Sequence, residues 1–283
     1  MSATASAPRT LAPFGRRQLT VAGVDELGAY RVLRAADPDG PMPDPGQFAM
    51  LAAAERWGAG ADERPFVPRA FSVARWSGGE AHFLLEDVGP GTRRLCELRA
   101  GEQLWCLGPL GVGFTAPSPG HRALLVGGGV GIAPLAIWQD RLLQDGATPR
   151  VLLGFRDRAH AAGAALLTDA AVATDDGSVG HHGFVTELLA AELDRGEPVT
   201  VYACGPPSML EAVRALCAAR RTPAQLALEA GMACGYGACF GCAVPAADGG
   251  YLRVCVDGPV IDAARLACVA AHGGQDTSAG QPA

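Results

Sequence analysis

The sequence predicts a multidomain α/β fold of three consecutive modules: an antiparallel β-barrel, a parallel α/β domain and a small cysteine-rich C-terminal domain. Short apolar runs broken by Gly and Pro come first, strands and helices then alternate, and four of the nine cysteines crowd together near the C-terminus. A chain of 283 residues is long enough for two or three such cores. We expect the modules at residues 15–118, 119–224 and 225–270, with disordered tails at 1–14 and 271–283.

The composition excludes several classes of protein. The net charge is −6 and no block of basic residues occurs, so nucleic acid and anionic membrane surfaces are not expected partners. No apolar run reaches the length of a membrane span, and the first residues lack the order of a secretory signal. We therefore expect a cytoplasmic protein. An odd number of cysteines without a secretory signal also argues against a full set of disulfides.

The first module is predicted as a six-stranded barrel. Helical periodicity is largely absent here apart from residues 92–98. Short strands at even spacing, separated by turn residues, are typical of a closed antiparallel barrel. The clearest strands are expected at 28–34, 47–51, 69–74, 81–86 and 103–107.

The second module changes to a strand–helix alternation. Strands are expected at 123–126, 150–155, 171–174 and 198–203, with a further candidate at 225–229. Helices are expected at 133–143, 161–168, 186–193 and 207–221. Such alternation predicts a parallel sheet with helices on both faces.

The cysteine pattern predicts a 2Fe–2S cluster. Its spacing is Cys234-x4-Cys239-x2-Cys242-x12-Cys255, and the first two spacings are those of plant-type clusters held by four thiolates. Glycines at 235, 237 and 241 would let the loop wrap closely around a cluster and point N–H groups at sulfur. Zinc and disulfides are the alternatives, but structural zinc is usually held by two close pairs of ligands.

The fourth ligand is less firmly marked than the other three, because Cys268 competes with Cys255. We favour Cys255, since the segment 249–254 has the pattern of a hairpin that returns the chain to the loop.

Two glycine motifs in the second module point to a dinucleotide. The run Gly127-Gly-Gly-Val-Gly-Ile-Ala-Pro134 follows a buried strand and opens a helix, where phosphates are bound. A tight turn without a ligand is the alternative. Cys204-Gly205 ends a later strand, at the edge where parallel sheets place ligands.

Asp175 and Asp176 follow a further strand of the same sheet. An acid at such a strand end can bind a ribose hydroxyl and would repel a 2′-phosphate, which favours NAD over NADP. Equally, the two residues can be solvated acids of a turn.

Two elements of the first module have the chemistry to bind a flavin. Arg69 and Phe71 open a strand, where they can pair with a pyrophosphate and stack on an aromatic ring. Gly91 precedes a short helix whose N–H groups can bind phosphate. Taken singly, such residues are more often structural.

The order of these motifs resembles the electron-transfer subunits of type B dihydroorotate dehydrogenase, within the ferredoxin reductase superfamily. The resemblance covers roughly residues 15–269. It implies FAD contacts at Arg69, Ala70, Phe71, Ser72, Leu84, Leu85, Glu86, Gly91 and Thr92. It implies nicotinamide contacts at Gly127, Gly129, Gly131, Cys204 and Gly205, and cluster ligands at Cys234, Cys239, Cys242 and Cys255. The chain departs from the family at Ala70, usually Pro, at Glu86, often basic, and at Val256, often Lys.

The resemblance also implies a function. The chain would be the flavin and iron–sulfur subunit of an NAD-dependent dihydroorotate dehydrogenase in pyrimidine (UMP) biosynthesis. Its partner would be an FMN-containing catalytic subunit, two copies of each forming a heterotetramer. Electrons would pass from FMN to the 2Fe–2S cluster, then to FAD, then to NAD⁺. No side chain is then needed as a catalytic acid or base.

Two other functions remain open from the sequence. A ferredoxin- or hydrogenase-type NAD(P) reductase subunit would use the same three modules. A redox-sensing regulator would need a DNA-binding or output module, and the sequence shows no motif of that kind.

Overall fold

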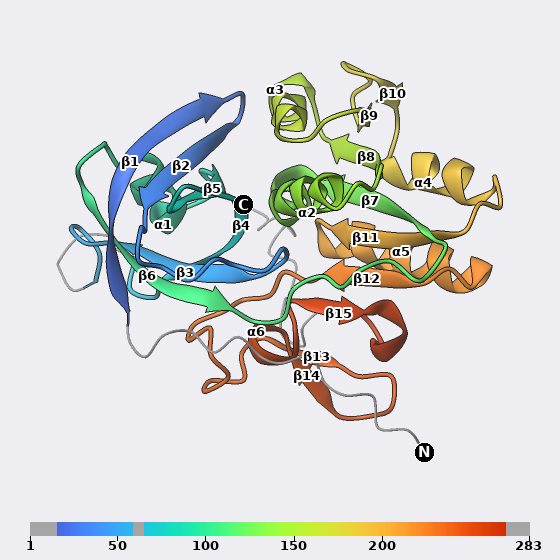
Figure 1. Ribbon diagram of the computed structural model, residues 1–283. Coiled ribbons are helices and arrows are strands. Elements are labelled where there is room, and N and C mark those ends of the chain that lie inside the picture. Colours follow the sequence, from blue (N-terminus) through green and yellow to red (C-terminus); the bar gives the residue numbers. More distant parts are fainter. Residues whose placement is uncertain (1–15, 59–64, 270–283) are drawn as a thin grey trace, which may run out of the picture.

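The computed structural model describes residues 16–58 and 65–269, so the predicted tails at 1–14 and 271–283 lie outside the described residues. Figure 1 shows the barrel on one side, the α/β domain on the other, and the C-terminal segment below both. The predicted order of a barrel, a parallel sheet and a small C-terminal region is confirmed. No helix within the described ranges is long and apolar enough to cross a membrane.

The barrel is closed by six antiparallel strands in the order β1-β2-β5-β4-β3-β6. Five of them coincide with the expected segments, and β1 supplies the sixth by pairing with both β2 and β6. One short helix, α1, packs against β5 and β3. The bounds are β1 Arg17–Leu27, β2 Tyr30–Ala36, β3 Phe48–Ala53, β4 Arg69–Ser77, β5 Glu80–Glu86, α1 Pro90–Cys96 and β6 Gln103–Leu110.

The second module is a seven-stranded sheet in the order β10-β9-β8-β7-β11-β12-β15. Alternate side chains of β7 enter different cores: Leu124 and Val126 pack with α4 and α5, whereas Leu125 packs with α2. Helices therefore cover both faces, as predicted. The bounds are β7 Arg122–Gly128, α2 Ala133–Gln144, β8 Arg150–Phe155, β9 Ala170–Thr174, β10 His181–His182, α4 Val185–Leu193, β11 Val199–Cys204, α5 Pro207–Arg220 and β12 Ala224–Ala227.

The helix expected at 161–168 is wrong. A short α-helix, α3 (Arg158–Ala161), begins earlier because the Asp157 carboxylate accepts a hydrogen bond from the His160 N–H and caps it. It continues only as a 3₁₀ turn, η2 (Ala162–Leu166). Gly163 favours this break, since glycine weakens a helix interior.

The C-terminal segment adds an unexpected strand to the sheet. β15 (Val260–Asp262) pairs antiparallel with β12, so the sheet is parallel except at this edge. The chain reaches β15 through the hairpin of β13 (Ala243–Pro245) and β14 (Tyr251–Arg253), followed by α6 (Val254–Asp257). A last 3₁₀ turn, η3 (Ala263–Arg265), follows. The cysteine-rich segment is thereby anchored to the α/β domain by backbone pairing.

Candidate functional site

The four predicted cluster ligands lie together as two pairs. Cys242 and Cys255 are buried with their sulfurs 3.2 Å apart. Cys234 and Cys239 make up the other pair, and the Cys239 side chain lies near enough to help lower the pKa of Cys234. Two thiolates for each of two irons is the ligand set of a 2Fe–2S cluster. Within the described ranges, no three His, Cys, Asp or Glu side chains are already gathered around a position for a single metal ion.

The loop between the pairs presents N–H groups to sulfur, as the sequence predicts. Burial alone would raise the pKa of Cys234, but hydrogen bonds from the backbone of Tyr236, Cys239 and Ala238 outweigh it and lower the pKa to about 6. Donors aimed at a thiolate stabilise its charged form, which is the form that binds iron. The pKa of Cys255 is instead raised to about 12, by burial and by its hydrogen bond with Cys242.

Two of the three glycines in the cluster loop have the positive φ that would let the loop wrap around a cluster. Gly235 and Gly237 have φ of 80° and 88°, in the left-handed region, whereas Gly241 does not. A Cβ on Gly235 would lie 2.5 Å from Cγ of Met50, so this loop packs directly on strand β3 of the barrel.

The hairpin predicted to return Cys255 to the loop is present. The Val254 N–H donates to the Cys242 carbonyl at 3.0 Å, which aligns the end of β14 with the loop. The pKa of Arg214 on α5 is raised chiefly by its hydrogen bond with Glu211, and the competitor Cys268 lies near enough to this arginine to add to the shift.

The predicted flavin motifs, some twenty residues apart in sequence, meet in space. The Arg69 guanidinium fills the room beside Gly91, where a Cβ would lie 2.6 Å from Nε. Arg69 also donates to the Val67 carbonyl at 2.6 Å. The Thr92 hydroxyl is held in the same loop, since it accepts from the Val88 N–H at 2.9 Å and donates to the Gly89 carbonyl. These contacts make an arginine-and-glycine cradle of the kind that holds a pyrophosphate.

The other predicted flavin residues divide into surface and core. Ala70, Phe71 and Ser72 are half-buried on β4. Leu84 and Leu85 are fully buried in two different cores, so only their backbone is available to a ligand.

The two predicted nicotinamide motifs also meet. A Cβ on Gly131 would lie 2.6 Å from the Gly205 backbone, so the glycine turn crosses the end of β11 at close range. The turn begins as a 3₁₀ segment, η1 (Gly129–Ile132), before α2, and Gly129 has φ of 55°. Gly127 and Cys204 are buried, and burial raises the pKa of the Cys204 thiol well above its ordinary value.

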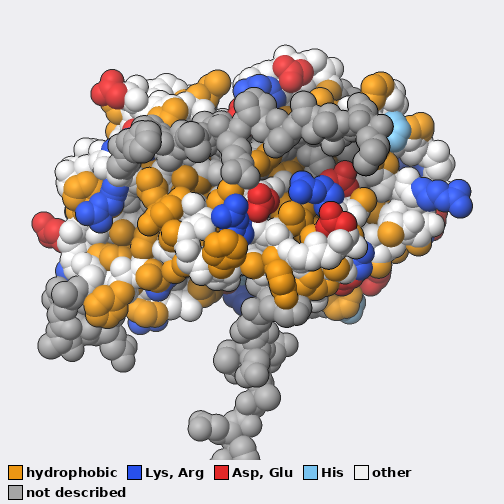
Figure 2. Space-filling view, turned by 90° about the horizontal axis from the view of Figure 1, so that it is seen from below, with side chains coloured by type: hydrophobic (Ala, Val, Ile, Leu, Met, Phe, Trp, Pro, Cys, Tyr) orange, Lys and Arg blue, Asp and Glu red, His pale blue; other side chains and the backbone are white. Residues whose placement is uncertain are grey.

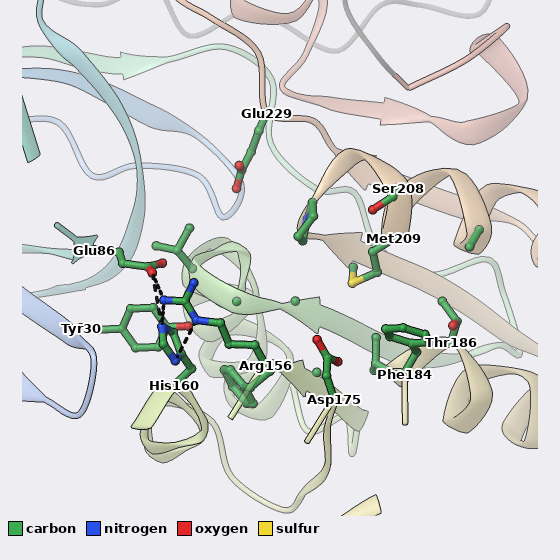
Figure 3. A pocket seen from close by; sticks show the side chains of 18 residues that line it. Tyr30, Glu86, Arg156, His160, Asp175, Phe184, Thr186, Ser208, Met209 and Glu229 are labelled. Carbon is green, nitrogen blue, oxygen red and sulfur yellow. Dashed lines mark hydrogen bonds and ion pairs between the residues drawn. The ribbon is translucent and has the colours of Figure 1, made fainter. Parts of the chain in front are cut away.

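A cavity of about 490 Å³ opens over this turn, between the barrel and the α/β domain (Figure 3). Glu86, Gly129 and Asp175 are the residues among its lining that the sequence singled out. Burial raises the pKa of Asp175, and the neighbouring Asp176 adds to the shift. Phe184, Thr186 and Glu229 line the cavity too. Sequence reasoning offered no reason to choose five further lining residues: Tyr30, Arg156, His160, Ser208 and Met209.

A charged cluster crosses from the barrel to the α/β domain at one end of the cavity (Figure 3). The Glu86 carboxylate on β5 accepts from Arg156 Nη2 at 2.9 Å and lies 3.3 Å from His160 Nε2. His160 Nδ1 contacts Asp157 at 2.7 Å, and this hydrogen bond lowers the pKa of Asp157. Glu86, at a position where a basic residue is common, thus joins the two modules.

Comparison with known proteins gives a consistent result. Residues 229–267 match the iron-sulfur cluster binding domain of dihydroorotate dehydrogenase B. The chain is 36% identical over 265 residues to the dihydroorotate dehydrogenase B (NAD(+)) electron transfer subunit of Geobacillus thermodenitrificans, covering 89% of this chain and 99% of that one. It is 40% identical to the same subunit of Listeria monocytogenes, covering 77% of this chain and 85% of that one.

Solved structures share the fold at lower identity. A structure of the NADH-dependent reduced ferredoxin-NADP oxidoreductase matches with a TM-score of 0.73 at 23% identity, covering 92% of this chain and 91% of that one. Phthalate dioxygenase reductase matches with a TM-score of 0.58 at 16% identity, covering 90% and 96%. Both likenesses concern the arrangement of the modules.

Proposed function

This chain belongs to the family of dihydroorotate dehydrogenase B electron transfer subunits, and from that membership we propose that it delivers electrons from a dihydroorotate-oxidising subunit to NAD⁺. The observation that carries the proposal is the set of two thiolate pairs at Cys234/Cys239 and Cys242/Cys255, which lies in the segment matching the family's cluster-binding domain. The reaction would belong to the de novo synthesis of UMP.

The residues present fit the two cofactors that the family implies. The four cysteines would hold a 2Fe–2S cluster, and the cradle of Arg69 and Gly91 would hold the FAD pyrophosphate. When bound, the cluster exchanges single electrons and FAD exchanges one or two, which connects one-electron transfer to hydride transfer at nicotinamide. The N–H groups of Tyr236 and Cys239 would stabilise the Cys234 thiolate. The glycine turn before α2 would receive the nicotinamide dinucleotide.

The remaining parts of the proposal concern the assembly. We infer an FMN-containing catalytic subunit as the partner, two copies of each subunit in the complex, and a cytoplasmic location. The oxidation of dihydroorotate itself would take place on that partner, and this chain would act as its flavin and iron–sulfur oxidoreductase subunit.

The test is to purify the chain by affinity from its native cells and to assay the product for NAD⁺-dependent orotate formation. We expect a coloured protein with flavin and cluster absorption, about two irons per chain, and a co-purifying dihydroorotate-oxidising subunit. A colourless protein loaded with zinc would refute the cluster. Reduction of NAD(P)⁺ by ferredoxin or hydrogen, without orotate formation, would establish the ferredoxin- or hydrogenase-type alternative instead.

A further inference from the structure

One buried phenol in the cavity has no partner. Tyr30 starts strand β2 of the barrel, is 0% exposed, and lines the cavity over the glycine turn (Figure 3). Its Oη makes no hydrogen bond to any of the described residues. A buried hydroxyl is nearly always hydrogen-bonded in a folded protein, so an unpaired one at a cavity wall is free to bond a ligand atom there.

The ring of Tyr30 is fixed by its surroundings. It stacks edge-on against His160 with ring centroids 5.5 Å apart. On another side it fills the room left by Gly163, where a Cβ would lie 2.9 Å from the ring. The preceding turn is tied to α3, since the Ala29 N–H donates to the Ala159 carbonyl at 3.0 Å. The hydroxyl is therefore held in place by contacts with the α/β domain.

The hydroxyl is directed at the glycine turn. A Cβ built on Gly129 would lie 3.9 Å from Oη, and this is the only heavy atom within 4 Å of that Cβ position in the described structure. The turn leads into α2, whose N-terminal N–H groups have no side-chain cap. The N-terminus of a 12-residue helix behind a glycine turn attracts phosphate.

We propose that Tyr30 Oη donates a hydrogen bond to a phosphate oxygen of the nicotinamide dinucleotide bound over Gly129. Tyr30 is then a positioning residue that the barrel contributes to a site otherwise built by the α/β domain. The inference rests on the proposed function, because it takes NAD⁺ as the substrate. FAD also carries a diphosphate, so the experiment must separate the two ligands.

The test compares Tyr30→Phe with Tyr202→Phe in the purified, flavin-loaded chain. Tyr202 is an equally buried phenol, but its Oη donates to the Thr115 carbonyl at 2.9 Å inside the core. Titration with NAD⁺ should show the Kd of Tyr30→Phe raised about tenfold or more, the expected loss for a hydrogen bond to a charged group. Tyr202→Phe should keep the wild-type Kd, and both variants should keep wild-type flavin content.

Thermal unfolding without NAD⁺ provides the second readout. Tyr30→Phe should unfold at the same or a higher temperature than the wild type, because it removes an unpaired buried hydroxyl, whereas Tyr202→Phe should unfold at a lower temperature. An unchanged Kd in Tyr30→Phe overturns the inference and leaves the proposed function intact. Loss of flavin with unchanged NAD⁺ affinity also overturns it. Failure of the wild type to bind NAD⁺ overturns both.

Discussion

Cys255 lies thirteen residues beyond Cys242 in sequence, yet their sulfurs are 3.2 Å apart. Replacing Cys255 with Ser should lower the iron content from about two per chain to well below one, because one iron loses a thiolate. Cys268→Ser is the matched control and should keep full iron content and cluster absorption. Iron analysis and visible absorption give the result. If Cys268→Ser lost its iron and Cys255→Ser kept it, the fourth cluster ligand would be Cys268 and not Cys255.

Glu229 should make the stability of the protein depend on pH. Its side chain lines the cavity and keeps part of its surface open to solvent, and desolvation of its carboxyl by the cavity walls raises its pKa above the ordinary value. As pH rises, Glu229 loses its proton in the unfolded chain before it does so in the folded chain. The favourable contribution of its protonated form to the folding free energy is therefore complete below the ordinary Glu pKa and is lost as pH rises through the folded pKa. Glu229→Gln should therefore match the wild type near pH 4 and exceed its Tm increasingly toward neutral pH.

The control for this pH series is Glu211, whose pKa is lowered by a hydrogen bond from Arg214. The ionised Glu211 carboxylate stabilises the fold above the ordinary Glu pKa, and this stabilisation is lost as pH falls through the folded pKa. Glu211→Gln should therefore lower the Tm slightly near neutral pH and leave it unchanged in acid. Differential scanning calorimetry at four or five pH values measures both series. A Tm gain of Glu229→Gln that is the same at every pH would refute ionisation as its cause.

At the scale of single residues, local chemistry decided what could be predicted. The cysteines and Gly235 are recognisable because a cluster loop needs thiolates and positive φ within a short stretch. Tyr30, Arg156 and His160 are not, because they come together from the barrel and the α/β domain without a shared local motif. Their roles depend on how the barrel packs against the α/β domain, and this packing cannot be predicted from the spacing of residues in the sequence.

Among the elements, η1 and the end of β11 cross with their backbones in close contact at the candidate nicotinamide site. Gly131→Ala would place a Cβ 2.6 Å from the Gly205 backbone, and neither backbone can yield freely. We expect a loss of about 1–3 kcal/mol in unfolding free energy, the usual cost of overpacking. Gly89→Ala is the control, because a Cβ there meets nothing within 4 Å and its φ of 166° is ordinary extended backbone.

Urea denaturation of both glycine variants gives the unfolding free energies. Gly131→Ala should bind NAD⁺ more weakly as well as lose unfolding free energy, because the same turn lies under the cavity. Equal stability of the two variants would contradict the close crossing.

Elements with strong periodicity or clear termini were predictable, and the two misjudged ones depend on tertiary contacts. Helix α2 begins as expected at the Ala-Pro pair. The α-helix expected at 161–168 is instead the 3₁₀ turn η2, in which Gly163 packs closely against the ring of Tyr30. β15 is only three residues long, too short for a periodic signal, and exists because the edge of β12 is available.

In the whole molecule, one of the hydrophobic cores is built from all three modules. Phe48, Met50 and Leu110 of the barrel join Cys242 and Val254 of the C-terminal segment and the helices α4 and α5. Sheet pairing through β15 and a backbone bridge between Val112 and Pro259 add to this connection. The cluster segment is thus held against both neighbours, which fixes the positions of the sites relative to one another.

The face that carries the cluster segment is rich in exposed apolar side chains. Figure 2 looks at the molecule from below in Figure 1, and hydrophobic side chains gather on this face. Tyr236 and Phe240, on the cluster loop, are 62% and 61% exposed. Phe240 also has φ of 57°, a strained backbone for an aromatic residue, and its ring is held by the Arg253 guanidinium 5.1 Å from the ring centre. We therefore predict that Phe240, which is strained and exposed beside Cys239 and Cys242, contacts the catalytic subunit.

Phe240→Asn should weaken the complex with the catalytic subunit without damaging this chain. Asn tolerates the left-handed backbone that Phe240 adopts, so the Tm should be equal or slightly higher. Loss of an aromatic residue at the centre of an interface costs about 2 kcal/mol or more, so the Kd for the catalytic subunit should rise about thirtyfold. Leu143→Ser, at the end of α2 and 44% exposed, is the control for an apolar surface residue away from the cluster. Surface plasmon resonance on protein with unchanged cluster absorption measures both, and equal affinities would place the catalytic subunit on another face.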